Sequence, residues 1–354
     1  TGPARMAGGV SSARRAHAPG GAVSGRRGRP SGAGRTDEPV VGPDGGALDL
    51  GRFRFDAAIP PGGYRWLYTD AVSEDGRFSL VLIALLGSVF SPYYAWSGRK
   101  RPLDHCALNV CLYGPHGRRW AMTERRAGAV SARPDALTIG PSGVRFEDGA
   151  LIFDIAERGA PIPRAVRGQV VVRPEITQAE AFALDPAGRH VWRPAWPRAR
   201  VSVRFAAPDL NWDGDGYVDM NAGAEPLEAA FSSWHWSRAT LSEGAGILYD
   251  CRWANGDEHA LALRIGSDGR VKRAMVPPRS GLPRTGWGID RETRSQSGAH
   301  VVETLEDTPF YARSLVSTDA FGAPCVAMHE SLDLNRFASN WVRMLLPFRM
   351  PRAF

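Results

Sequence analysis

Two short patterns in the middle of the chain bring together side chains that could carry out acid–base chemistry. The first is His190-x-Trp192 and the second is Tyr217-x-Asp219-x-Asn221. Alternate side chains of a β-strand point to the same face, so each pattern would project from one side of a sheet. The sequence therefore predicts an imidazole, an indole, a phenol, a carboxyl group and an amide that line one concave surface.

Asp219 is the residue that we expect to donate a proton. A carboxyl group among aromatic and apolar neighbours loses the hydration of its charged form, so its pKa rises and it can stay protonated near neutral pH. His190 is the imidazole that we expect to shuttle protons, because its neighbour on the same face of the strand is Trp192. Each residue has a structural alternative: Asp219 could cap the turn after Gly216, and His190 could be a hydrogen-bonded strand residue.

Aromatic side chains elsewhere in the chain could form an apolar tunnel with electron-rich walls. Ring faces attract cations, so such walls could stabilise a carbocation as well as hold an apolar chain. Ordinary core filling is the alternative for most of these rings. Besides Asn221, the residues that we expect to bind substrate are Tyr93, Tyr94, Trp96, Trp234 and Trp236.

A calcium loop is a rival interpretation of the same region. Asp209-x-Asn211-x-Asp213-Gly214 reproduces the first half of an EF-hand loop. Position 12 of that pattern is Met220 and not a bidentate acid, so we expect a polar turn and no metal. The chain also lacks the G-x-S-x-G, Walker and Rossmann patterns, so we expect no cofactor.

The elements that must position these residues are short strands separated by turns. The 354 residues include 40 Gly, 27 Pro and 11 Trp, with little helical periodicity. Predicted strands include Phe53–Ile59, Tyr64–Ala71 and, near the C-terminus, Trp341–Phe348. The most apolar segment, Phe78–Phe90, is shorter than the ~20 residues of a spanning helix and is predicted to be a buried strand that bends at Gly87. This spacing predicts a mainly β protein built as antiparallel barrels or sandwiches.

Composition divides the chain into a tail and two predicted β domains. Residues 1–46 contain seven Arg, three acids and almost no large apolar side chain, so we expect them to be disordered. The predicted domains span residues 47–207 and 208–354. The net charge is +7, of which the tail carries +4, and no nucleic-acid-binding module is apparent, so an anionic membrane surface is the expected partner of the tail. The four cysteines form no C-x-x-C pair; Cys106 and Cys111 lie in apolar strands and are predicted to be buried free thiols.

Several segments, in the same order, resemble one family, the acyclic carotenoid 1,2-hydratases (hydroxyneurosporene synthases) of phototrophic bacteria. The matching segments are residues 87–96, 102–109, 120–124, 216–223, 234–236, 308–314, 329–332 and 341–349. The resemblance covers about residues 50–354. It implies two lipocalin-like β units and a cofactor-independent hydratase whose functional His-x-Trp and Tyr-x-Asp pairs fall on His190, Trp192, Tyr217 and Asp219.

The activity that the resemblance implies is addition of water to the terminal C1–C2 double bond of a carotenoid such as neurosporene or lycopene. Asp219 would protonate C2, the rings of Trp192 and Tyr217 would stabilise the cation at C1, and His190 would hold the attacking water. Since such a substrate resides in a bilayer, we expect peripheral contact with lipid at the cytoplasmic side of the photosynthetic membrane. A non-catalytic lipocalin-like carrier of an apolar polyene is the alternative, but a carrier has no use for a buried acid.

Overall fold

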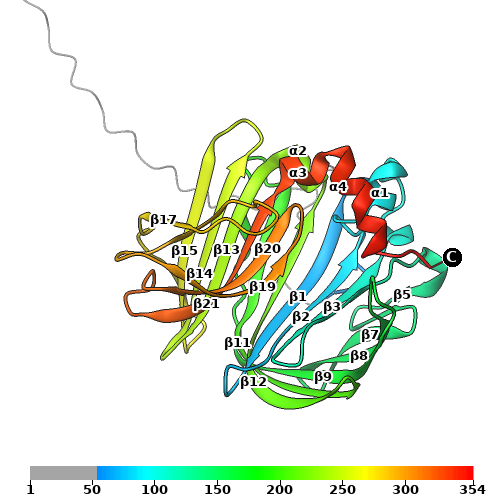
Figure 1. Cartoon of the computed structure of the whole chain (residues 1–354), viewed down its shortest axis with the longest axis horizontal. Coiled ribbons are helices and arrows are strands. Elements are labelled where there is room, and N and C mark those ends of the chain that lie inside the picture. Colours follow the sequence, from blue (N-terminus) through cyan, green and yellow to red (C-terminus); the bar gives the residue numbers. More distant parts are fainter. Residues whose placement is uncertain (1–53, 354) are drawn as a thin grey trace, which may run out of the picture. The chain divides into compact units, whose positions relative to one another are not determined.

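The computed structural model describes residues 54–353, which are mainly antiparallel β. Figure 1 shows two large sheets that face each other, with α2, α3 and α4 grouped at one end of the strands. The prediction of a mainly antiparallel β fold is confirmed. The predicted tail, residues 1–46, lies outside the described residues.

The first sheet has twelve strands in the order β4-β3-β2-β1-β12-β11-β9-β8-β7-β6-β5, with β10 paired to β11 at one side. These strands are β1 (Tyr64–Ser73), β2 (Ser79–Leu86), β3 (Ala107–Tyr113), β4 (Arg119–Met122), β5 (Val130–Ala132), β6 (Ala136–Ile139), β7 (Ser142–Glu147), β8 (Ala150–Arg158), β9 (Ala165–Ile176), β10 (Phe182–Ala183), β11 (His190–Ala207) and β12 (Asp209–Gly223).

The second sheet has seven strands in the order β16-β15-β14-β13-β21-β20-β19, and β17 pairs with β18 in a separate hairpin. Their bounds are β13 (Phe231–Leu241), β14 (Gly244–Trp253), β15 (Glu258–Gly266), β16 (Val271–Arg273), β17 (Arg279–Leu282), β18 (Arg291–Arg294), β19 (His300–Asp307), β20 (Tyr311–Thr318) and β21 (Cys325–Asp333). The helices are α1 (Pro92–Trp96), α2 (Leu227–Ala230), α3 (Leu334–Ala338) and α4 (Asn340–Leu345), with short 3₁₀ turns η1 (Pro102–Asp104), η2 (Ala127–Ala129) and η3 (Leu346–Phe348).

Strand alternation divides the apolar residues of the first sheet between two cores. On β1, Trp66 and Tyr68 belong to the core shared with the second sheet, whereas Leu67 belongs to the core on the opposite face. On β12, Tyr217 faces the shared core and Val218 faces away from it. Because both faces are covered, these strands contain few exposed polar positions, as expected for central strands.

The two predicted domains do not coincide with the two sheets. Residues 207 and 208 lie between β11 and β12, which pair with each other within the first sheet. The chain passes to the second sheet only after Gly223, through α2. The antiparallel pairing of β11 with β12 therefore places both functional patterns of the sequence in one sheet.

Three strand predictions differ from the structure. No strand covers Phe53–Ile59 within the described residues, and β2 ends at Leu86 instead of continuing to Phe90. The predicted bend at Gly87 is present: its φ is +63°, and a Cβ there would lie 2.7 Å from the carbonyl oxygen of Gly63. Trp341–Phe348 forms α4 and η3 and not a strand.

Two further findings concern membrane crossing and thiols. Among residues 54–353, no helix has the length and apolarity to cross a membrane. Cys106 and Cys111 are buried free thiols, as the sequence predicts.

Candidate active site

Asp219 lies on β12 with its side chain directed between the two sheets, and it is 5% exposed. One oxygen, Oδ2, accepts hydrogen bonds from Nε1 of Trp192 (2.9 Å) and from the hydroxyl of Tyr217 (3.0 Å). The other oxygen, Oδ1, is buried and has no hydrogen-bond partner among the described residues. Two donors therefore fix the carboxyl group through one oxygen and leave the other available.

Burial raises the pKa of Asp219 well above its ordinary value of 3.8, and the hydrogen bonds from Trp192 and Tyr217 offset only part of that rise. Nearby Glu330 and Asp70 add to the rise. A raised pKa extends the pH range over which a carboxyl group stays protonated, which is the property that a general acid needs. The role of Asp219 as the proton donor stays a prediction.

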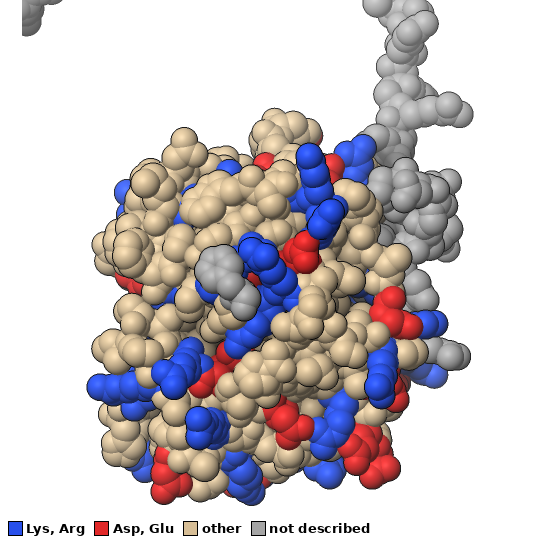
Figure 2. Space-filling view, turned by 90° about the vertical axis from the view of Figure 1, so that its right-hand side faces the viewer, with Lys and Arg blue, Asp and Glu red and all other residues tan. Residues whose placement is uncertain are grey.

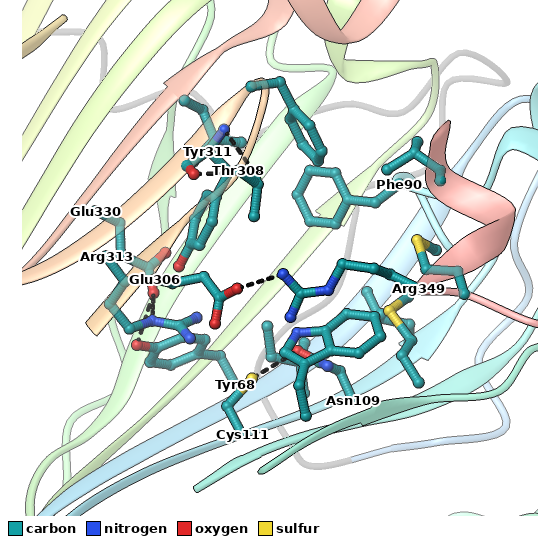
Figure 3. A pocket seen from close by; sticks show the side chains of 18 of the residues that line it. Tyr68, Phe90, Asn109, Cys111, Glu306, Thr308, Tyr311, Arg313, Glu330 and Arg349 are labelled. Atoms are coloured by element: carbon teal, nitrogen blue, oxygen red, sulfur yellow. Dashed lines mark hydrogen bonds and ion pairs between the residues drawn. The ribbon is translucent and has the colours of Figure 1, made fainter. Parts of the chain in front are cut away.

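A largely apolar cavity of about 380 Å³ lies between the sheets (Figure 3). Four residues singled out from the sequence line it: Asp219, Asn221, Trp234 and Trp236. Rings supply much of the remaining wall, from Trp66, Tyr68, Phe90, Trp120, Tyr249, Trp287, Phe310, Tyr311 and Phe348. The space suits an apolar chain that extends along the rings and reaches Asp219.

Trp192 and Tyr217 contact the acid but are not among the cavity-lining residues. Both are fully buried, and the ring of Tyr217 packs 5.4 Å from that of Trp236. They therefore orient Asp219, whereas Trp236 and Tyr68 present rings to the cavity itself.

His190 is separated from the acid by its position at the start of β11. Its Nδ1 is 2.9 Å from the hydroxyl of Tyr64, and its Nε2 is 3.7 Å from Oε1 of Glu225. It is fully buried and is not among the cavity-lining residues. Within the described residues, His190 lies at the first position of β11, and its ring packs against that of Phe231 with the centroids 4.9 Å apart.

The three predicted aromatic residues on α1 also lie away from the cavity walls. Ser91 caps this helix by accepting a hydrogen bond from the amide of Tyr94, and Pro92 begins it. The hydroxyl of Tyr94 donates to the carbonyl of Gly63, while Trp96 is 55% exposed and Tyr93 packs edge-on against it. Tyr93, Tyr94 and Trp96 are not among the residues that line the cavity.

The sequence analysis missed a set of charged residues that line the cavity. Glu330 on β21 and Arg313 on β20 are directly paired across the second sheet, and Nε of Arg313 donates to Oε1 of Glu330 at 2.9 Å. Glu306 accepts from Arg349 at 2.7 Å. The only signal in the sequence for such a pair is an acid and an Arg on two strands that are expected to be neighbours. No local pattern indicates these pairs, because the two residues of each pair lie far apart in the chain.

The calcium-like pattern lies within strand β12 and not in a loop. Asp213 forms an ion pair with Arg204 on β11 at 2.9 Å, and the amide of Asn211 donates to Asp209. The residues that the structure describes contain no group of three or more His, Cys, Asp or Glu side chains arranged to hold a metal ion. The oxygen atoms of the pattern thus form ordinary strand-surface contacts.

Comparison with solved structures relates the fold to other proteins. A putative AttH from Nitrosomonas europaea aligns with a TM-score of 0.58 and 17% identity, covering 83% of this chain and 98% of that one. The protein CghA, solved with Sch210972, aligns with a TM-score of 0.53 and 10% identity over 79% of this chain and 94% of that one. At these identities the likeness concerns the fold alone.

Comparison of sequences is more specific. A family model described as "Carotenoid hydratase CrtC" matches residues 82–354. The acyclic carotenoid 1,2-hydratase of Thiocapsa roseopersicina is 52% identical over 338 residues, covering 94% of this chain and 84% of that protein. The enzyme of the same name from Rubrivivax gelatinosus is 44% identical, over 84% of this chain and 76% of that protein. The chain belongs to the carotenoid hydratase family.

Proposed function

We propose that the protein adds water across the terminal C1–C2 double bond of an acyclic carotenoid of the neurosporene or lycopene type. The relatives that share 44–52% identity with it are named acyclic carotenoid 1,2-hydratases. The observation that carries the proposal is Oδ1 of Asp219, a buried acid oxygen without a protein partner among the described residues, at the wall of an apolar cavity.

In the proposed reaction, Asp219 donates its proton to C2 and the positive charge forms on the tertiary carbon C1. As Asp219 becomes a carboxylate, the hydrogen bonds from Trp192 and Tyr217 become charge-assisted and therefore stronger. The protein thereby stabilises the charge that develops in the transition state. Trp192 and Tyr217 act through Asp219 in this scheme.

The cation itself would be stabilised by rings that line the cavity. Tyr68 and Trp236 lie 5.5 Å apart, centroid to centroid, and both belong to the cavity wall. A ring face attracts a cation more strongly when water is excluded. The apolar wall also limits the number of nucleophiles that can reach C1, so one water molecule captures the cation.

Turnover distinguishes this function from that of a polyene carrier. Purified protein is incubated with detergent-dispersed lycopene, without added cofactor, and the pigments are separated and weighed by mass spectrometry. We expect a product heavier than lycopene by one water per hydrated end. Stoichiometric binding of lycopene without any hydrated product would support the carrier and contradict the hydratase.

We also propose that the protein collects its substrate at the surface of a bilayer, on the cytoplasmic side of the membrane. The support is an exposed apolar stripe on α4 and η3: Trp341, Met344, Leu345 and Phe348 are 47%, 68%, 41% and 70% exposed. Their spacing of i, i+3, i+4 and i+7 places them on one face of a helix.

This apolar stripe is continuous with the proposed binding site, because Leu345 and Phe348 also line the cavity. Trp287, which is 47% exposed, lines it as well. On the face shown in Figure 2, basic and acidic side chains are interspersed with uncharged surface. Insertion of apolar side chains is therefore the main attraction that the stripe offers to a bilayer.

Liposome flotation tests this contact. The double variant Met344→Gln/Phe348→Gln should bind liposomes more weakly than the wild type. Met275→Gln, which changes a methionine that is even more exposed (85%) and lies outside the cavity wall, should bind as the wild type does. Equal flotation of the double variant and the wild type would contradict the proposed contact surface.

A further inference from the structure

Glu330 is a second acidic side chain that faces the same cavity, from the opposite sheet. Its Oε1 accepts hydrogen bonds from the hydroxyl of Tyr68 (2.9 Å) and from Nε of Arg313 (2.9 Å). Arg313 is 2% exposed, so the ion pair is buried. Figure 3 shows Glu330, Arg313 and Tyr68 grouped at one side of the cavity.

Tyr68 connects this carboxylate to the acid. In the first sheet, Tyr68 on β1 is the direct register partner of Asp219 on β12. Side chains at directly opposed positions of an antiparallel pair lie on the same face, with Cβ atoms about 5 Å apart. The side chain of Tyr68 therefore starts beside Asp219, and its hydroxyl contacts Glu330. Tyr68 thus links the two carboxyl groups at one end of the cavity.

Asp219 and Glu330 have different hydrogen-bond partners. Asp219 contacts only neutral donors, the indole of Trp192 and the phenol of Tyr217, whereas Glu330 is paired with a guanidinium group. Two carboxyl groups in such different environments can take different parts in one reaction.

Polar atoms without partners also belong to residues of the cavity wall. Among the described residues, the buried atoms that lack a hydrogen bond include Oδ1 of Asp219, Nδ2 of Asn221, Nε1 of Trp236 and the hydroxyl of Tyr311, and all four residues line the cavity. Buried polar atoms of this kind are commonly satisfied by water, which needs two to four such partners. The hydroxyl of Tyr311 points toward Glu330 in Figure 3.

We propose that Glu330 is the base that accepts the proton of the water adding to C1. The inference rests on the proposed hydratase function. Both hydrogen bonds to Glu330 end on Oε1, which leaves Oε2 to accept from water. Two more acids line the cavity, Glu306 and Asp307. Glu306 is less suited because each of its oxygens already accepts a bond, from Arg349 and from Tyr113. Asp307 accepts from the backbone amide of Trp287, a residue that is 47% exposed, and among the described residues its side chain has no hydrogen bond to a residue that contacts Asp219.

His190 is also less suited to this role, since it does not line the cavity and its ring nitrogens face Tyr64 and Glu225. With Glu330 as base the reaction balances. The O–H bond of Asp219 breaks as C2–H forms, the oxygen of water bonds to C1, and the proton of that water passes to Glu330. Return of this proton to Asp219 restores both groups, and the net change is alkene plus water to tertiary alcohol, without oxidation or reduction.

A turnover experiment in D₂O separates the two carboxyl groups. In the variant Glu330→Gln, Asp219 still delivers a deuteron to C2, but the cation is captured slowly and loses a proton to return the alkene. We expect hydration to fall at least ~100-fold while deuterium continues to enter the recovered lycopene, measured by mass spectrometry. Asp219→Asn should lose both hydration and deuterium incorporation.

Glu157→Gln is the matched control, because Glu157 is a buried carboxylate that is paired with Arg125 and Ser142 and does not line the cavity. It should hydrate lycopene as the wild type does. Near-wild-type hydration by Glu330→Gln would overturn the proposal. So would equal loss of hydration and deuterium incorporation in a Glu330→Gln protein that unfolds at the wild-type temperature.

Tyr68→Phe keeps the proposal testable if Glu330→Gln does not fold, because it removes only the hydroxyl that positions Glu330. It should slow hydration about 10-fold with deuterium incorporation retained, and unchanged hydration would count against the proposal. A wild-type protein that neither hydrates lycopene nor incorporates deuterium would refute the hydratase function itself. The wild-type measurement therefore distinguishes failure of the hydratase function from failure of the proposed role of Glu330.

Discussion

Replacement of Asp219 by Asn should have opposite effects on activity and on stability. The amide oxygen of Asn can accept the hydrogen bonds that Trp192 and Tyr217 donate to Oδ2, so the local structure should persist. The amide has no acidic proton, so the protonation of C2 loses its donor. A general acid contributes about 10²–10⁴-fold, which corresponds to about 3–5 kcal/mol of transition-state stabilisation.

The effect on stability follows from the raised pKa of Asp219. The folded protein keeps the proton above pH 3.8, whereas the unfolded chain loses it, so the folded state binds more protons there. The contribution of this group to stability is fully present below pH 3.8 and is lost as the pH rises toward the folded pKa. The Asn variant has no carboxyl group to titrate at this position, so its stability does not fall in this way as the pH rises. At pH 8 it should unfold at a temperature equal to or higher than that of the wild type.

The assay combines lycopene turnover with thermal unfolding between pH 5 and pH 8. We expect turnover at least ~100-fold below the wild type, together with a difference in unfolding temperature that favours the variant more as the pH rises. Near-wild-type turnover by a folded Asn variant would refute the role of Asp219 as the acid. A variant that becomes less stable than the wild type with rising pH would refute the neutral state of its carboxyl group.

Three other predictions concern acid stability, metals and the N-terminal tail. Burial lowers the pKa of His235 to about 4, so the stability that neutral His235 contributes above pH 6.5 is lost as the pH falls toward 4. This loss amounts to about 3 kcal/mol. It should be smaller in His235→Gln when unfolding is measured over the same pH range. Turnover should survive dialysis against EDTA, and loss of activity that calcium restores would revive the metal interpretation of Asp209–Asp213. Deletion of residues 1–46 should weaken binding to anionic liposomes at low salt, by about 1 kcal/mol for each Arg near the surface. Turnover of detergent-dispersed lycopene should not change. Full flotation of the shortened chain would show that the tail is dispensable for liposome binding.

Strand alternation predicts that Trp192, Tyr217 and Asp219 project from one face of a sheet. Tyr217 and Asp219 are two residues apart on β12, and the pairing of β11 with β12 brings Trp192 within 2.9 Å of the carboxyl group. The same reasoning grouped His190 with Trp192, but it says nothing about where along a strand the cavity ends. His190 lies at the first position of β11, next to Tyr64, and it is not part of the cavity wall.

The charged side of the cavity could not be predicted because it depends on contacts between the two sheets. Glu330 meets Tyr68, a residue 262 positions earlier in the chain, and no local pattern encodes such a contact. Long-range pairing also explains why the boundary between sheets follows β12 and does not precede it.

The C-terminal segment shows how an apolar run can be misread. The sequence analysis predicts a strand over Trp341–Phe348. The apolar positions Trp341, Met344, Leu345 and Phe348 follow helical spacing, and the segment forms α4 and η3 with these side chains exposed. The period of the apolar residues thus encodes the local conformation of this segment.

The protonation state of Asp219 is the most direct test of its proposed role as the proton donor. Protein labelled with ¹³C at the aspartate carboxyl carbons is titrated by NMR, and the signal that is missing in Asp219→Asn identifies the residue. We expect the carboxyl group of Asp219 to be still protonated at pH 7. Titration of that signal near the ordinary value of 3.8 would contradict it, because an ionised Asp219 has no proton to give to C2.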